Sequence, residues 1–160
     1  MQCLQPQLSD DIELIIDSDN GERTIGHKRN DLLAKATGDY VVFIDDDDRV
    51  TSCYIAEIMA GIAQGVDVVC VNAIHTIDGH SPKAVIDKPY QNWCETPNAY
   101  LRGVQWRDAV KREIAVSVPY PNIRFGEDRA WTIAMEATGL IKTWREAVKP
   151  TYFHEYVSHK

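Results

Sequence analysis

The first half of the chain alternates short apolar, β-rich runs with segments of helical period, and this alternation constrains the fold more than any other feature. Residues 11–16 (DIELII), 40–44 (YVVFI) and 66–74 (VDVVCVNAI) have the length and composition of buried strands. Between them, residues 24–38 and 52–65 have the apolar period of helices. This order is typical of an α/β fold with a mostly parallel sheet, flanked by helices and connected by right-handed crossovers.

The second half of the chain is less regular than the first. Residues 74–98 contain three prolines and little periodicity, which indicates a hairpin or long loops over the sheet. Residues 104–116 return to a helical period, and residues 128–139 predict a further helix after a turn. Residues 141–157 indicate extended segments broken at a proline. Both halves fit one domain of 160 residues.

Net charge and cysteine spacing narrow the functional classes. A formal net charge of -7 argues against nucleic-acid binding, because a polyphosphate requires a basic surface. The four cysteines show no metal-binding spacing, and no secretory signal precedes them, so we expect reduced, mostly buried thiols in a cytoplasmic protein. No apolar run approaches the roughly 20 residues that span a bilayer. We therefore expect a catalytic or binding domain without a transmembrane segment.

Two acidic turns follow predicted strands. Asp17 and Asp19 come after the first strand, and four consecutive aspartates, residues 45–48, come after the second. Ligands of parallel α/β sheets bind outside the carboxyl ends of the strands, so we expect both turns to border one crevice. Mg²⁺ or Mn²⁺ would neutralise the four repelling carboxylates, with Asp45 and Asp47 projecting to the same side. The alternative is a solvated acidic turn in which an aspartate caps the next helix.

The predicted helix over residues 24–38 begins with a basic cluster. Its first turns contain Lys28, Arg29 and Asn30, beside the first acidic turn. Positive side chains and free backbone N–H groups at a helix start suit a diphosphate. A solvated basic turn on a surface helix is the alternative. A cationic cluster next to acidic metal ligands is the combination that a metal-bound nucleotide diphosphate requires.

Further polar and aromatic residues have two interpretations each. Glu127 and Asp128 start a predicted helix after a tight turn, where one carboxylate serves as a general base or Asp128 caps the helix. His154 is a metal ligand or a packed histidine between aromatic residues. Trp93 and Trp106 stack on a sugar ring or pack in the core. The residues alone leave these alternatives open.

Taken together, these segments resemble a family-two glycosyltransferase of the Rossmann-like GT-A fold. DIELIIDSD resembles the second strand of that family and its nucleotide-contacting aspartate. IGHKRNDLLAKATGDYVVFIDDDDRV is similar to its RN...A.G.Y..F.D.DD segment, which places the DxD motif on Asp45 and Asp47 and an additional aspartate on Asp48. VKREIAVSVPYPNIRFGEDRAW resembles the later block that ends in the ED of the catalytic base. The resemblance runs in order from Asp11 to Trp131.

The resemblance implies an activity and a division of the domain. A family-two enzyme of this kind transfers a sugar from a nucleotide diphosphate donor to a saccharide or other hydroxyl acceptor, with inversion at the anomeric carbon. Mn²⁺ or Mg²⁺ would be its cofactor. Residues 1–160 would form one GT-A-like domain, in which residues 1–73 bind nucleotide and metal and residues 74–160 form the acceptor side.

The resemblance also implies a role for each matching residue. Asp128 would deprotonate the acceptor, and Glu127 would orient the site. The residues implied in donor binding are Asp17, Asp19, Lys28, Arg29, Asn30, Asp45 and Asp46. The residues implied in metal binding are Asp47, Asp45 and His154, the last because a late histidine completes the metal shell in some GT-A enzymes.

The beginning of the chain departs from the family pattern. The family opens with a strand that ends in a P.YN type turn and with a helix that follows, whereas MQCLQPQLSDD resembles only the end of that helix. We therefore expect an N-terminally shortened fold with an exposed sheet edge, which a second copy of the chain would close. This departure favours a nucleotide-sugar- or metal-binding module, or a fragment, over a competent enzyme, but such a module has no need for a positioned Asp128. A different metal-dependent phosphoryl-transfer or nuclease domain is the third hypothesis.

Overall fold

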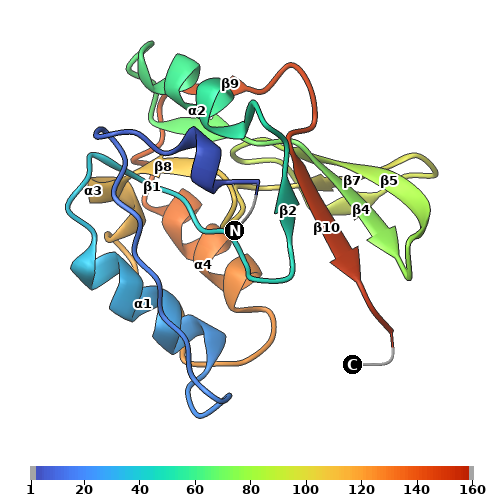
Figure 1. The fold of residues 1–160 in the computed structure, drawn as a ribbon, viewed down its shortest axis with the longest axis horizontal. Coiled ribbons are helices and arrows are strands. Elements are labelled where there is room, and N and C mark those ends of the chain that lie inside the picture. Colours follow the sequence, from blue (N-terminus) through green and yellow to red (C-terminus); the bar gives the residue numbers. More distant parts are fainter. Residues whose placement is uncertain (1–2, 159–160) are drawn as a thin grey trace.

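Helices and strands alternate only in the first half of the chain, up to β3, in a computed structural model that describes residues 3–158 (Figure 1). The helices are η1 (Gln5–Gln7, a 3₁₀ turn), α1 (Ile25–Lys35), α2 (Tyr54–Ile62), α3 (Arg112–Ala115) and α4 (Glu127–Ala137). The strands are β1 (Tyr40–Val41), β2 (Arg49–Val50), β3 (Val68–Cys70), β4 (Ala73–Ile77), β5 (His80–Asp87), β6 (Cys94–Glu95), β7 (Ala99–Arg102), β8 (Ala109–Lys111), β9 (Trp144–Glu146) and β10 (Tyr152–Tyr156). The helices predicted over residues 24–38, 52–65 and 128–139 are confirmed as α1, α2 and α4.

A four-stranded sheet has the strand order β1, β8, β3 and β9. Strands β1 and β3 both pair antiparallel with β8, and β3 pairs parallel with β9. Strands β1 and β3 therefore run in the same direction, as expected, but they are not neighbours. The predicted α/β class is confirmed, while the pairing is mixed rather than mostly parallel, because β8 enters between the two strands.

The helix predicted over residues 104–116 is wrong for most of its length. Only the end of this segment forms a helix, α3, and the part before it forms β8 inside the sheet. The carboxylate of Asp108 accepts a hydrogen bond from the backbone N–H of Val71 at 2.6 Å, which ties the start of β8 to the chain that follows β3. Tertiary packing thus overrides the local helical period.

Residues 11–16 do not form the predicted strand. The chain from Ile12 to Asp19 belongs to neither sheet, and Leu14 and Ile16 are 43% and 64% exposed. In Figure 1 this blue segment runs across α1. A strand is held by backbone hydrogen bonds to a neighbour, and no strand among residues 3–158 pairs with this segment.

A six-stranded sheet has the strand order β2, β10, β4, β5, β7 and β6. Strands β4 and β5 form an antiparallel hairpin whose turn contains Asp78 and Gly79, both at positive φ, so the predicted hairpin is confirmed. Strand β10 confirms the predicted extended tail, and it pairs parallel with β4 and antiparallel with β2. Because β2 directly follows the four aspartates, this pairing brings the acidic turn next to β10.

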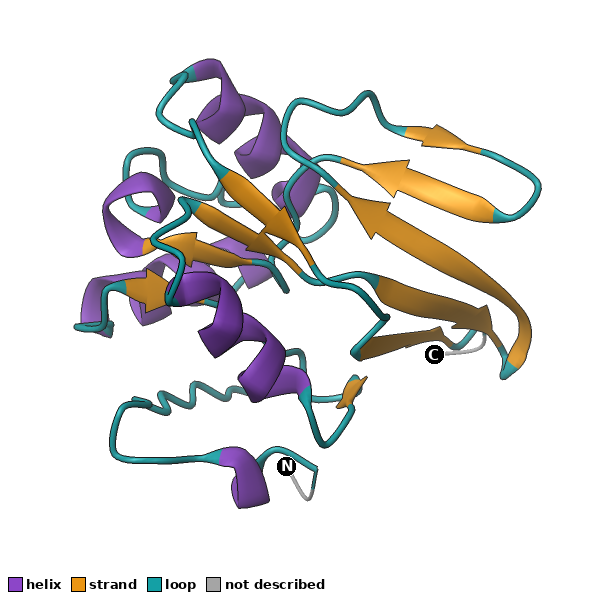
Figure 2. Ribbon diagram, turned by 90° about the horizontal axis from the view of Figure 1, so that it is seen from above, coloured by secondary structure: helices purple, strands orange, loops and turns teal. Residues whose placement is uncertain are grey.

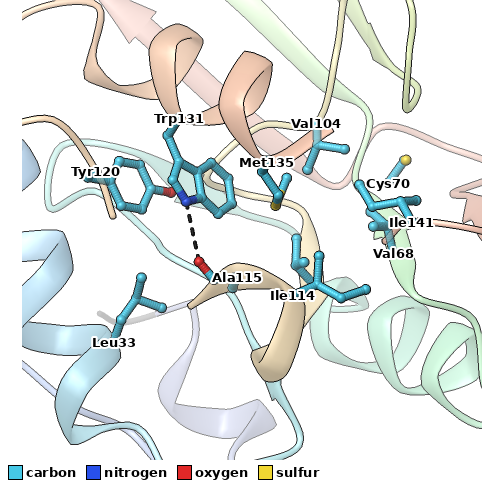
Figure 3. Packing of buried hydrophobic residues seen from close by; sticks show 11 residues of the cluster. Leu33, Val68, Cys70, Val104, Ile114, Ala115, Tyr120, Trp131, Met135 and Ile141 are labelled. Atoms are coloured by element: carbon cyan, nitrogen blue, oxygen red, sulfur yellow. Dashed lines mark hydrogen bonds between the residues drawn. The ribbon is translucent and has the colours of Figure 1, made fainter. Parts of the chain in front are cut away.

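The hydrophobic core lies on both faces of β3. Val68 and Cys70 pack in one cluster with residues of α1 and α4, and Val69 packs in a second cluster with residues of α2. In the first cluster, the indole N–H of Trp131 donates to the backbone oxygen of Ala115 at 3.4 Å (Figure 3). Helices therefore flank both faces of the four-stranded sheet (Figure 2).

The expectations from composition have different outcomes. Cys70 is buried, but Cys3, Cys53 and Cys94 are exposed, so the expectation of mostly buried thiols is wrong. These three cysteines lie outside the two hydrophobic clusters, in a turn, before a helix and on an outer strand. No helix within residues 3–158 is long and apolar enough to cross a membrane.

Candidate active site

Arg29 connects the second acidic turn to the start of α4. Its guanidinium donates to Glu127 Oε1 at 2.9 Å from Nη1, and to Asp45 Oδ1 and Oδ2 at 3.2 and 3.3 Å from Nη2. Arg29 is 4% exposed, and three aromatic rings lie 5.1–5.7 Å from its Cζ atom. These rings belong to Phe43, Trp106 and Tyr120. Residues from both halves of the chain thus meet around one buried cation.

The contacts of Arg29 and Asn30 differ from the donor-binding role that the resemblance implies for these residues at the start of α1. The guanidinium of Arg29 is occupied by two carboxylates rather than presented to a ligand. Asn30 exchanges two hydrogen bonds of 2.9 Å with the backbone of Tyr120, through its amide nitrogen and its amide oxygen. Asn30 therefore fixes the segment before α4, and Arg29 fixes the two carboxylates.

Burial shifts the pKa of both carboxylates that Arg29 contacts. Desolvation raises the pKa of Asp45 above its usual value, and the positive charge of Arg29 opposes this rise. The pKa of Glu127 is raised for the same reason and opposed by the same cation. Arg29 thus favours the charged form of two carboxylates that the protein interior disfavours.

Asp48 is the buried member of the four aspartates. Its side chain is 1% exposed, accepts a hydrogen bond of 2.5 Å from the hydroxyl of Tyr152 and lies 2.9 Å from Nδ1 of His154. The hydrogen bond to Asp48 raises the pKa of His154. The imidazole of His154 stacks on His75, with ring centroids 5.1 Å apart.

The sequence implies no role for Tyr152, and for Asp48 it gives only its match to the additional aspartate of the family motif. The structure adds that Asp48 is the last aspartate before β2, which pairs with β10, the strand that contains Tyr152 and His154. Asp46 and Asp47, by contrast, are exposed. The four adjacent carboxylates therefore differ in exposure, with Asp48 buried, Asp45 half-buried against Arg29, and the other two exposed.

The first acidic turn forms a local network of ion pairs. Arg23 lies 2.7 Å from Asp17, 3.2 Å from Asp19 and 2.7 Å from Asp31, and Lys28 lies 3.3 Å from Asp19. The backbone N–H of Arg23 is the largest cause that lowers the pKa of Asp19 to about 2. One oxygen of Asp17, Oδ2, is buried without a hydrogen-bond partner among the described residues. The predicted cluster of Lys28 beside the acids is present, and it is already paired.

The two carboxylates at the start of α4 point to different partners. Gly126, at φ 77°, is the N-cap of the helix, and no side chain caps it, so the interpretation of Asp128 as a helix cap is wrong. Glu127 is buried against Arg29. The carboxylate of Asp128 accepts no hydrogen bond from the residues that the structure describes, and it is half-buried. Asp128 is thus the member of the pair that remains available to a ligand.

The predicted metal ligands are not assembled into a closed site. No three His, Cys, Asp or Glu side chains within residues 3–158 lie close enough together to hold an ion. Asp45 contacts Arg29, and His154 contacts Asp48. A carboxylate at Nδ1 orients an imidazole so that its other nitrogen faces a metal, and Mg²⁺ is commonly held by one or two carboxylates plus phosphate oxygens. These residues therefore fit a cation that takes most of its ligands from a bound diphosphate, and they do not fit a cation held by the protein alone.

Comparison with known proteins identifies the family. The glycosyl transferase family 2 model matches residues 4–135, so the chain belongs to this family. No curated protein matches the chain. The structure is similar to S. aureus TarS 1–349 in complex with UDP, at 18% identity and a TM-score of 0.61, over 88% of this chain and 42% of that one. It is also similar to S. aureus TarS 1–349 in complex with UDP-GlcNAc, at 18% identity and a TM-score of 0.63, over 91% and 42%.

These matches confirm the recognition of the family and the predicted fold. The chain spans less than half the length of the TarS 1–349 chains that it matches. At this level of identity the likeness shows the fold, and the residue assignments rest on the site geometry described above.

Proposed function

We propose that this chain binds a nucleotide diphosphate sugar and transfers its sugar, with inversion, to an acceptor hydroxyl in a reaction that depends on Mg²⁺ or Mn²⁺. The observation that carries the proposal is the bridge of Arg29 between Asp45 and Glu127, which joins the acidic turn to the helix start that contains Asp128. The complexes of the similar TarS chains with UDP and UDP-GlcNAc support a nucleotide-sugar donor. The expected cytoplasmic location belongs to the same proposal.

Asp128 is the general base of the proposed reaction. Its carboxylate has no hydrogen-bond donor among the described residues, so it is free to accept a proton from the acceptor hydroxyl as that oxygen attacks. Glu127 does not share this role, because its oxygen is bound to Arg29. Instead, the Glu127–Arg29 contact holds the start of α4 at a fixed distance from the acidic turn.

The acidic turns form the donor side of the proposed site. Asp17 offers the unsatisfied Oδ2 to an N–H donor of the nucleotide base. Asp45, Asp47 and His154 are the protein groups that would face a cation, which when bound neutralises the charge that develops on the departing diphosphate. Asp46 is exposed beside them and would contact the donor from the rim.

The proposal is tested by calorimetry and by donor hydrolysis and transfer assays. We expect UDP, GDP or CDP to bind more tightly with Mn²⁺ present, and Asp47→Ala to abolish this dependence on the metal. Asp128→Asn should preserve nucleotide binding and eliminate transfer, because the amide cannot take up the proton. Asp39→Asn, an exposed aspartate on the other side of β1, is the matched control. Transfer at the unmodified rate by Asp128→Asn would exclude this residue as the base.

Binding without turnover is the second candidate function. It is favoured by the segment that precedes Asp17, which has no strand partner among the described residues and so places this aspartate less rigidly than a sheet would. Metal-dependent nucleotide binding with no hydrolysis and no transfer would support the binding module.

A further inference from the structure

Arg102, at the end of β7, is held in a fixed orientation by neighbouring groups. Its Nη1 donates to the backbone oxygen of Cys94 at 3.0 Å and to that of Leu101 at 2.9 Å. Its Cζ atom lies 5.1 Å from the ring centre of Trp93 and 4.9 Å from that of Tyr100. Two carbonyl groups and two aromatic rings thus position one guanidinium before any ligand arrives.

The other edge of this guanidinium has no partner. Among the described residues, no acceptor contacts Nε or Nη2 of Arg102 and no carboxylate lies at ion-pair distance, while Asp87 and Glu95 act on its charge from farther away. Nε and Nη2 are the pair of donors that binds two oxygens of a carboxylate or phosphate side by side. Lys83 offers a contrast on the same sheet, because it lies 5.0 Å from the ring of Tyr100 but pairs with Glu95.

A second unpaired cation lies on the same indole. The Cζ atom of Arg129 is 5.4 Å from the ring centre of Trp93, and Arg129 is exposed with no ion pair among the described residues. Two guanidinium groups therefore lie within 5.4 Å of the centre of one indole ring, in a chain of net charge -7. Trp93, for which the sequence leaves sugar stacking and core packing open, is half-buried and contacts both cations.

This basic cluster lies beside the proposed catalytic base. A Cβ atom at Gly103 would be 3.1 Å from Nε1 of Trp93 and 2.8 Å from Cγ2 of Thr132, so the indole packs against α4. Thr132 in turn donates to the backbone oxygen of Asp128 at 2.9 Å, and Arg129 is the next residue after Asp128. The cluster therefore lies in the acceptor half of the chain, and its member Arg129 directly follows Asp128 in α4.

We propose that Arg102 and Arg129, arranged on Trp93, form an acceptor subsite for an anionic group, so that the acceptor is a hydroxyl compound that carries a phosphate or a carboxylate. Arg102 binds two oxygens of this group through Nε and Nη2, and Arg129 adds a second positive charge. An acceptor anchored in this way directs a nearby hydroxyl toward Asp128. This inference rests on the proposed function for the identity of the bound molecule as an acceptor.

The test uses small probes and no glycosyl transfer. The intact chain is titrated by NMR with glycerol 3-phosphate, with glucuronate and with glycerol, while the indole resonance of Trp93 is followed. We expect the two anions to shift this resonance and glycerol to leave it unchanged. Arg102→Gln should weaken anion binding about tenfold to hundredfold, as the loss of charge-assisted hydrogen bonds predicts. Arg102→Lys keeps the positive charge but loses the paired N–H donors, so it should also weaken anion binding.

Two further variants keep the test decisive. Arg129→Gln changes an exposed side chain, so it keeps the fold and should weaken anion binding as well. Arg124→Gln removes the same charge from an exposed residue of the loop before α4 and should have no effect. Equal weakening by Arg102→Gln and Arg124→Gln, or no shift with either anion, would overturn the subsite.

A titration with UDP separates this inference from the proposed function. We expect Arg102→Gln to bind UDP as the unmodified chain does. Loss of UDP binding in this variant would assign the cluster to the diphosphate of the donor and overturn the acceptor subsite. Absence of UDP binding by the unmodified chain, together with normal binding of glycerol 3-phosphate, would instead count against the proposed function and leave the anion site supported.

Discussion

The two acidic turns of this protein neutralise their charge in opposite ways. Around Asp17 and Asp19 the compensating cations, Arg23 and Lys28, lie within eleven residues of the acids along the chain. Around the four aspartates the partners are Arg29, sixteen residues away from Asp45, and residues of β10, more than one hundred residues away. The first turn is closed by its own sequence, and the second depends on the whole fold.

The first turn is therefore neutralised largely by residues next to it in the sequence, whereas the second turn is held by residues that only the fold brings near. The ion pairs of the first turn are partly exposed, so water and salt weaken them, and they leave only Oδ2 of Asp17 for a ligand. In the second turn, Asp45 contacts Arg29 and the buried Asp48 contacts Tyr152 and His154, while the two aspartates between them are exposed.

The largest effect is expected from breaking the buried bridge. Arg29→Met should lower the free energy of unfolding by about 3–5 kcal/mol, because it leaves Glu127 buried without its cation. Urea denaturation followed by fluorescence measures the change. Arg29→Lys keeps the charge, but its single ammonium group cannot contact both carboxylates as the branched guanidinium does. This variant should lose less stability than Arg29→Met. A loss below about 1 kcal/mol in Arg29→Met would show that the bridge is no stronger than a surface ion pair.

The bridge also shows how far sequence reasoning reaches. The helical period of residues 24–38 places Arg29 on the same face as Leu33, and burial of that face is a local consequence of amphipathic spacing. The assignment of Asp45 and Glu127 to one active site was implied by the family resemblance, whose motifs occur in a fixed order. The role of Arg29 between them was not, because a basic residue near a helix start has the same sequence pattern whether it binds phosphate or a buried carboxylate.

Other parts of the fold could not be predicted from local pattern. Strand β8 has a helical period in the sequence, and only its place between β1 and β3 makes it a strand. Residues 11–16 have the composition of a strand, but a strand also requires a neighbour, which local composition does not report. The contact of Asp48 with His154 joins residues 106 positions apart, beyond any spacing rule.

A smaller effect is expected at the buried end of the second turn. Asp48→Asn should lower the pKa of His154, because the hydrogen bond to this carboxylate is the main cause of its rise. A histidine whose pKa is raised on folding stabilises the protein fully below its ordinary value of about 6.5 and loses this contribution as the pH rises through the folded value. The unmodified chain should therefore lose this stability as the pH rises through the raised pKa of His154, and Asp48→Asn should lack it at any pH.

NMR titration of the His154 ring, combined with urea denaturation at several pH values, checks this expectation. At acidic pH the variant should be less stable by about 1–3 kcal/mol, the usual cost of a lost partner for a buried polar group. Asp39→Asn, an exposed aspartate, is the control and should leave both the ring titration and the pH profile unchanged. An unchanged His154 titration in Asp48→Asn would assign the pKa shift to another group.

The smallest effect is expected at the first acidic turn, where Arg23→Gln removes a cation shared by three carboxylates. The side chain of Arg23 is the main cause that lowers the pKa of Asp17, whereas backbone N–H groups are the main cause for Asp19. The substitution retains the backbone, so the pKa of Asp17 should rise clearly and that of Asp19 should rise little. Carboxyl NMR titration resolves the two, and Glu13, whose pKa is lowered by Thr37, should not change.

Carboxylates with lowered pKa values stabilise above their ordinary range and lose this contribution as the pH falls, so any loss of stability in Arg23→Gln should appear at neutral pH and vanish in acid. Equal rises at Asp17 and Asp19 would mean that the first turn, like the second, depends on a single side chain.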